Sequence, residues 1–161
     1  MPILHLQSQG QGQTPDGKQV AVPPAVVLQQ KGPVVQIIVG IQGAFAASLA
    51  QQGKPVPSPL SGLALIDTGA SNTCIDEDAA KTIGLPVIDV GTMHSASHTR
   101  TPCNIYPVQF EIMPFKIRFE SPRTMGAALR EQGIMAIIGR DLLQVCTLFY
   151  NGLTGQITLS I

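Results

Sequence analysis

The sequence has little charge and no excess of either sign. Ten Lys and Arg residues balance ten Asp and Glu residues, and charged residues make up only 12% of the 161 positions. No run of like charges interrupts this balance. Nucleic acids and anionic membranes bind proteins through clustered positive charge, so we expect neither as a partner.

Cysteines and long apolar segments are also scarce. The three cysteines, Cys74, Cys103 and Cys146, form no CxxC pair, so the sequence predicts neither a disulfide framework nor a zinc ribbon. No basic N-terminal region precedes an apolar segment, and no stretch approaches the roughly 20 apolar residues that span a bilayer. These absences predict a soluble, cytoplasmic protein without a membrane segment.

Short strands and turns are what the composition favours. Hydrophobic residues make up 44% of the chain, which also contains 16 Gly and 13 Pro. This profile predicts a single, mainly β domain over residues 1–161, with one or two short helices. Strands are expected over residues 1–6, 33–41, 87–93, 101–112, 115–120 and 134–139, with a final hairpin turning at Asn151-Gly152.

Three segments carry other signals. A Gln- and Gly-rich stretch makes the remainder of residues 1–31 a flexible segment after a terminal strand, and Pro23-Pro24 is expected to break its apolar end. Residues 42–61 read as an inserted surface loop, because their Pro-rich end cannot join a sheet. A short helix is predicted after Asp76, which serves as its N-cap, with Gly84 ending it.

An acid stands at the end of an apolar run in "GLALIDTGASNTC", residues 62–74. A lone carboxylate there is costly, but two facing carboxylates can share a proton, one acting as general base and the other as general acid. The chain contains one Asp-Thr-Gly and no second acid in a comparable setting, so the second carboxylate has to come from a second copy. The alternative is that Asp67 only caps a turn that Thr68 and Gly69 complete.

A second motif, "AIIGRDLLQVCTLFY" at residues 136–150, follows about seventy residues downstream. Together the two motifs resemble the retropepsin-like aspartic proteases, which include the retroviral enzymes and their cellular and bacterial relatives. The resemblance covers residues 33–161 and implies an all-β, retropepsin-like fold, with a closed, bent, barrel-like subunit that forms a two-fold dimer. It implies a homodimeric aspartic endopeptidase that acts on peptide or protein substrates and needs no cofactor or metal.

The resemblance also assigns roles to residues. Asp67 would be catalytic, Thr68 would hydrogen-bond across the dimer, and Gly69 would offer its carbonyl to substrate. A flap hairpin at about residues 91–103 would close over the peptide, and the terminal strands would form the dimer interface. The implied substrate-binding residues are Leu65, Ala70, Ser71, Ala96, Ser97, His98, Met135 and Ile137, and the implied supporting residues are Ile138, Gly139, Arg140 and Asp141.

Some features depart from the family pattern. Retroviral members usually place an acid four positions after the catalytic Asp, where it pairs with the Arg of the second motif, but this chain has Ser71 there. Arg140 therefore needs another partner, such as a carbonyl. The expected flap tip lacks glycine, and the ending "YNGLTGQITL" is more similar to cellular relatives.

Other readings of these residues compete. A dimeric peptide-binding module on the same fold that does not cleave is the main alternative function, although it would have no need of the acid. Zinc at His94, His98 and Cys103 is disfavoured because one hairpin supplies three ligands and no fourth. The acids Asp76, Glu77 and Asp78 could suggest a cation site, but a helix start explains them.

Overall fold

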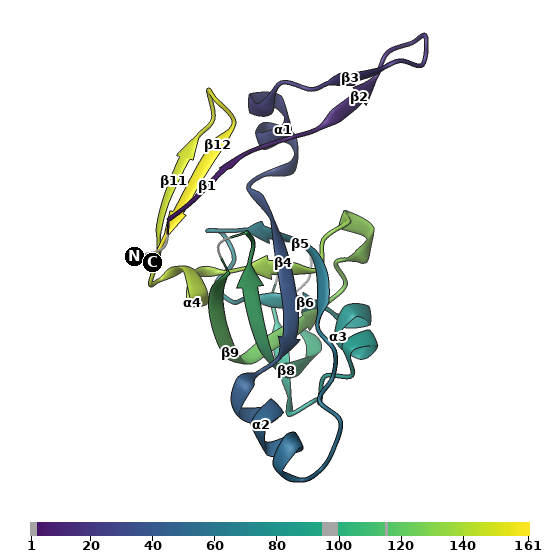
Figure 1. The fold of residues 1–161 in the computed structure, drawn as a ribbon, viewed down its shortest axis with the longest axis vertical. Helices are drawn as coiled ribbons and strands as arrows, with labels where there is room; N and C mark the ends of the chain where they lie inside the picture. Colours follow the sequence, from purple (N-terminus) through teal and green to yellow (C-terminus); the bar gives the residue numbers. More distant parts are fainter. Residues whose placement is uncertain (1–2, 95–99, 115) are drawn as a thin grey trace.

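The computed structural model describes residues 3–94, 100–114 and 116–161, and in these residues the chain is mostly β with four short α-helices and one 3-10 helix (Figure 1). The elements are β1 (Ile3–Gln7), β2 (Gln11–Gln13), β3 (Gln19–Ala21), α1 (Pro24–Lys31), β4 (Val34–Ile41), α2 (Gly43–Gln51), β5 (Leu60–Ile66), β6 (Cys74–Asp76), α3 (Glu77–Ile83), β7 (Asp89–Met93), β8 (Thr101–Ile112), β9 (Ile117–Ala127), η1 (Arg130–Gln132), β10 (Ala136–Ile138), α4 (Arg140–Leu143), β11 (Thr147–Asn151) and β12 (Gln156–Ser160).

Six strands close into a barrel. Their order is β4-β5-β10-β6-β9-β8, and a pairing between β8 and β4 closes the ring, while β7 extends the sheet beyond β8. Side chains alternate between the inside and the outside, as in β4, where Val35, Ile37, Val39 and Ile41 are buried. The predicted closed, mainly β subunit is confirmed.

The short strand β10 occupies the centre of the barrel wall. It pairs in parallel with the end of β5, Ile138 lying opposite Ile66, and antiparallel with β6, Ile137 lying opposite Cys74. Ala136 and Ile138 are fully buried. The strand that carries the second motif is therefore inserted between the two strands that enclose the first.

Helix α3 forms where its capping residues predict it. The Asp76 side chain accepts a hydrogen bond from Ala79 N at 3.1 Å, and Gly84 ends the helix in the left-handed conformation at φ 80°. Glu77 and Asp78 occupy the first turn, where the helix dipole favours negative charge. Ala80 and Ile83 are buried on the face that packs against the barrel.

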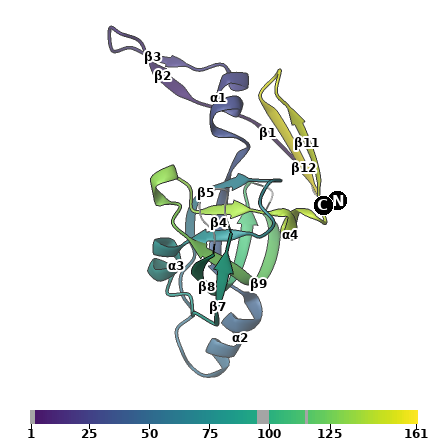
Figure 2. The ribbon, with the colours of Figure 1, turned by 180° about the vertical axis from the view of Figure 1, so that it is seen from behind.

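The two ends of the chain meet in a separate three-stranded sheet, β1-β12-β11, which lies at one end of the barrel (Figures 1 and 2). In this sheet β1 pairs with β12 of the same chain. Helix α1 packs against it, burying Leu28 with Leu4, Ile157 and Leu159. These residues belong to the same apolar cluster as the barrel core, so the terminal sheet and the barrel share one core.

The expected break at Pro23-Pro24 separates β3 from helix α1, and this helix was not predicted from the sequence. The helix begins at Pro24, where a fixed φ suits the first helical position and the missing N–H removes no helix hydrogen bond. Before it, β2 and β3 pair as a hairpin that projects from the body within the segment expected to be flexible (Figure 1).

Residues 42–61 contain more structure than a surface loop. Helix α2 occupies Gly43–Gln51, and Phe45 and Leu49 pack partly buried against the barrel core. Strand β9 continues as far as Ala127, beyond the strand predicted over residues 115–120, and η1 follows it. None of the helices in the described ranges has the length and apolar character needed to cross a membrane.

Candidate active site

Asp67 lies where β5 ends and the chain turns sharply. Its backbone N–H donates to Ile138 O at 3.0 Å, which anchors it to β10. Its carboxylate Oδ1 accepts from Gly69 N at 2.7 Å, and its carbonyl accepts from Ala70 N at 3.2 Å. The side chain is half-buried, so the turn presents a carboxylate whose orientation its own loop fixes while solvent can still reach it.

Arg140, a residue of the second motif, holds the Asp67 turn in place through hydrogen bonds. Its Nη1 donates to Thr68 O at 2.8 Å and to Gly69 O at 3.1 Å, and its Nη2 donates to Ser71 Oγ at 2.7 Å. In addition, its backbone N–H donates to Ala70 O at 3.0 Å. Two carbonyls and a hydroxyl thus serve the arginine where retroviral members usually supply an acid.

A buried polar network lies behind the turn. Asp141 accepts from Thr73 N at 3.0 Å and from Thr73 Oγ1 at 2.7 Å, and Thr73 Oγ1 accepts in turn from Gly139 N at 3.0 Å. Thr73 is 0% exposed. Sequence reasoning missed Thr73, because a threonine entering a strand is common and its contact with Asp141 depends on the tertiary fold.

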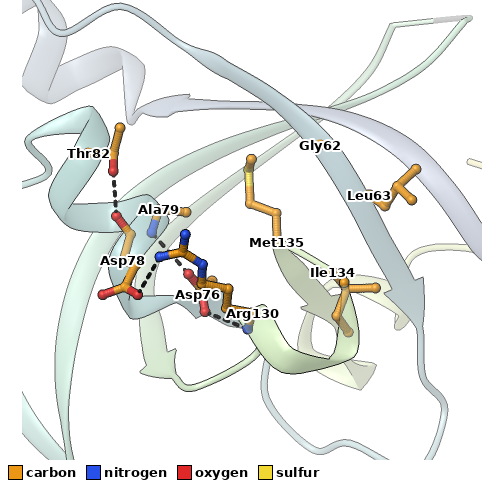
Figure 3. A pocket seen from close by; sticks show the side chains of 10 residues that line it. Gly62, Leu63, Asp76, Asp78, Ala79, Thr82, Arg130, Ile134 and Met135 are labelled. Atoms are coloured by element: carbon orange, nitrogen blue, oxygen red, sulfur yellow. Dashed lines mark hydrogen bonds and ion pairs between the residues drawn. The ribbon is translucent and has the colours of Figure 1, made fainter.

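A hollow of about 360 Å³ near α3 contains Met135 but not Asp67 (Figure 3). At its base the Asp76 carboxylate accepts from Ala79 N, from Leu129 N at 2.9 Å and from Arg130 N at 3.0 Å, and Asp78 pairs with Arg130 at its rim. Every one of these contacts holds the fold, so we assign this hollow to structure.

Of the two hollows that include Asp67, the larger has a volume of about 630 Å³, and we call it the cleft. It brings together Asp67, Gly69, Ala70, Ser71 and Ile137 of the predicted site. The remaining lining residues, which the sequence motifs did not single out as substrate-binding, are Asn72, Cys74, Thr92, Met93, His94 and Met125.

Other predicted residues lie elsewhere. Leu65 lines a further hollow of about 450 Å³, which also includes Asp67, Thr68, Leu148 and Tyr150. Ile138, Gly139, Arg140 and Asp141 follow one another behind the Asp67 turn, and their supporting role stays a prediction. The predicted flap residues Ala96, Ser97 and His98 fall outside the described residues, so their placement stays a prediction.

The search for metal ligands gives no candidate centre. Among the described residues, no group of three or more His, Cys, Asp and Glu side chains is arranged to hold an ion. Asp76 caps α3 and binds backbone N–H groups, which accounts for one acid of the 76–78 cluster without a cation.

Cys74 contributes a neutral sulfur to the cleft wall. Burial raises the pKa of its thiol to about 11, and nearby Cys103, Asp141 and Asp67 add to the shift in that order. A thiol with so high a pKa stays protonated at neutral pH and is a poor nucleophile. The Cys74 side chain therefore serves as part of the packed wall of the cleft and not as a reactive group.

Comparisons with known proteins address the family directly. No curated protein matches the chain. Among solved structures the chain is similar to a retropepsin-like aspartic protease from Rickettsia conorii, with a TM-score of 0.44, 10% sequence identity, and coverage of 98% of this chain and 91% of that one. A family model described as aspartyl protease matches residues 53–142, a range that includes both Asp67 and Arg140. The chain belongs to the aspartyl protease family.

Proposed function

We propose that the protein is an aspartic endopeptidase whose active site forms when two copies of the chain each contribute Asp67. The observation that carries this proposal is the composition of the cleft. Asp67 is the one carboxylate among the described residues that line it. Proton transfer by a carboxylate pair needs a second acid, and a second copy supplies it.

The chemistry follows from two carboxylates that share one proton. The ionised carboxylate takes a proton from a bound water as the water oxygen attacks the peptide carbonyl carbon, while the protonated partner hydrogen-bonds and protonates the carbonyl oxygen. The tetrahedral diol then collapses: the carboxyl that took the water proton gives it to the amine nitrogen, the other carboxylate takes back a hydroxyl proton, and the C–N bond breaks to release the amine. No covalent bond forms between enzyme and substrate.

The terminal sheet offers a place for the second copy. Strand β11 is an edge of the β1-β12-β11 sheet, and Phe149 and Tyr150 on it are exposed, at 61% and 49%. Exposed apolar edge strands invite pairing with another chain. Because Leu148 and Tyr150 share a hollow with Asp67 and Thr68, contact here would bring the partner next to the catalytic turn.

Around this centre the remaining residues take supporting roles. Thr68 hydrogen-bonds across the two-fold axis, and the Gly69 carbonyl, which accepts only one described donor, Arg140 Nη1, has a lone pair left for substrate. Ala70, Ser71 and Ile137 contact the peptide, together with Leu65 and Met135 once the dimer and substrate are in place. The β7–β8 hairpin is the flap, since Met93 and His94 on it already line the cleft.

The experiment is a mixing series between the wild-type chain and Asp67→Asn. Asn cannot act as general base or acid, so pure Asp67→Asn should lose about 10²–10⁴-fold in peptide cleavage while still forming dimers in analytical ultracentrifugation. In mixtures, activity should fall as the square of the wild-type fraction, since only dimers with two Asp67 residues work. Asp16→Asn, an exposed acid in the N-terminal hairpin, is the matched control.

Three results would contradict the proposal. A pure Asp67→Asn protein that cleaves a peptide library as well as wild type would show that this acid is not catalytic. A linear dependence on the wild-type fraction would show that one chain suffices. A wild-type chain that binds peptides without cleaving any would favour the binding module.

A further inference from the structure

Arg140, which contacts the cleft residue Ser71, is a cation that no acid of the described residues neutralises. Elsewhere in the described structure five Lys and Arg side chains pair with carboxylates within 4.0 Å, and Arg140 is not among them. Its guanidinium binds two carbonyls and the Ser71 hydroxyl, and the residue is exposed. A positive charge therefore stands directly behind Ser71.

The neighbouring acid does not cancel this charge by direct contact. Asp141 follows Arg140, but its carboxylate accepts from Thr73 N, Thr73 Oγ1 and Leu142 N. These three donors direct it into the buried network behind the turn.

The Ser71 hydroxyl lies between the Arg140 guanidinium and the cleft. Its Oγ accepts from Arg140 Nη2 at 2.7 Å, which leaves its own O–H free to donate, and Ser71 lines the cleft together with Asn72. A carboxylate oxygen that accepts from Ser71 Oγ would lie within about 5–6 Å of the guanidinium, given hydrogen bonds of ordinary length. Both the hydroxyl and the nearby charge favour an anion there.

We infer that this cleft selects peptide segments with an acidic side chain, Glu or Asp, at the position that reaches Ser71, with Ser71 and Arg140 as the specificity-determining residues. This inference rests on the proposed function. An acid at position 71 would neutralise the arginine within the chain; with serine there, the substrate supplies the anion.

Two copies of the chain make the inference more specific. Each copy contributes one Ser71 and one Arg140, so a dimer has two such subsites at equal distances from the bond that is cut. An extended peptide advances about 3.3 Å per residue, so its acidic side chains should be favoured at two positions placed symmetrically about that bond.

The test uses a peptide that the wild-type enzyme cleaves, with Glu, Gln or Lys placed in turn at each of the four positions on either side of the cut. Glu should exceed Gln about three- to fivefold in kcat/KM at the selected positions, the range expected of an exposed ion pair, and Lys should be the poorest. The Glu preference should shrink at high ionic strength.

Ser71→Asp supplies the matched variant, with Ser71→Asn as its neutral control of the same shape. Ser71→Asp should remove or reverse the Glu preference because its carboxylate pairs with Arg140, whereas Ser71→Asn should keep Glu ahead of Lys. Arg118→Gln, which removes an exposed arginine paired with Glu111, should leave the preference unchanged.

Binding to the Asp67→Asn protein separates the two proposals. Fluorescence anisotropy with labelled Glu and Gln peptides reports selection without cleavage, so the inference is decided even if no peptide is cut. Tighter binding of the Glu peptide that Ser71→Asp abolishes supports it. Equal Glu and Gln values in both assays, or a Glu preference that survives Ser71→Asp, overturns it.

Discussion

The Thr73 hydroxyl donates a hydrogen bond of 2.7 Å to the Asp141 carboxylate across 68 residues of sequence. The same hydroxyl accepts from Gly139 N, so one buried side chain bridges the segment that follows Asp67 and the segment that carries Arg140. The position of the Asp67 turn depends on this link as well as on the strands.

Removing that hydroxyl should weaken the whole fold. Thr73→Val keeps the shape of the side chain but leaves Gly139 N–H and one Asp141 oxygen without their partner, so the free energy of unfolding should fall by about 1–3 kcal/mol. Urea denaturation measures it. Thr82→Val, the same change on an exposed turn of α3, should cost less than about 0.5 kcal/mol. Equal losses in the two variants would remove the special role of Thr73.

Gly139 permits the close crossing of the two motif segments. A Cβ there would lie 2.6 Å from Asn72 C and 2.7 Å from Asn72 O, and these backbone atoms cannot move aside as a side chain can. Gly139→Ala should therefore destabilise the protein by about 1–3 kcal/mol and displace the Asp67 turn, lowering kcat more than KM rises.

Gly40→Ala is the control for that change. The nearest atom to an added Cβ is Pro59 Cβ at 3.5 Å, an ordinary contact, and alanine is better tolerated than glycine within a strand. Unfolding in urea measures the stability of both variants, and steady-state kinetics measures their kcat and KM. A Gly139→Ala protein as stable and active as Gly40→Ala would contradict the tight crossing.

Cys74 should be unreactive at neutral pH although it lines the cleft. With its pKa raised from 9.0 to about 11, its thiolate fraction at about pH 8 is near 0.1%, roughly a hundredfold below that of an unshifted thiol. Alkylation of Cys74, followed by peptide mapping in a mass spectrometer, should speed up about tenfold per pH unit up to about pH 11.

The same shift links Cys74 to stability. Because burial raises the pKa in the folded state, the neutral thiol's contribution is fully present below about pH 9 and is lost as the pH rises through about 11. Alkylation of the native protein at neutral pH as fast as that of the urea-unfolded chain would show that the thiol is neither buried nor shifted.

The chemistry of the site was more predictable than its surroundings. Asp67 and Arg140 lie in motifs whose residue order is local, and Asp76 and Gly84 mark α3 through capping, which is also local. Whether the Arg140 side chain binds a carboxylate or a backbone carbonyl depends on the fold. The absence of an acid at position 71 nevertheless excluded the carboxylate partner that is usual in retroviral members.

Long-range contacts explain what the sequence did not reveal. Thr73 has no local signature for its part in the network, and Met125 reaches the cleft only through the pairing of β9 with β6. Pro23-Pro24 break the apolar segment as expected, but Pro24 also starts helix α1, whose Leu28 is buried in the core with Leu4, Ile157 and Leu159. Local propensity could not weigh that packing.

The placement of β10 has a consequence for how the protein is made. As it is synthesised, the chain completes β5 and β6 well before Ala136–Ile138 emerges, so these two strands have to wait for the one that separates them. Contacts between distant residues slow folding, and unpaired strand edges are exposed in the meantime. A nascent chain that ends before residue 136 should hold Asp67 without the support of β10, so the proposed activity can appear only once the last sixth of the protein is being built.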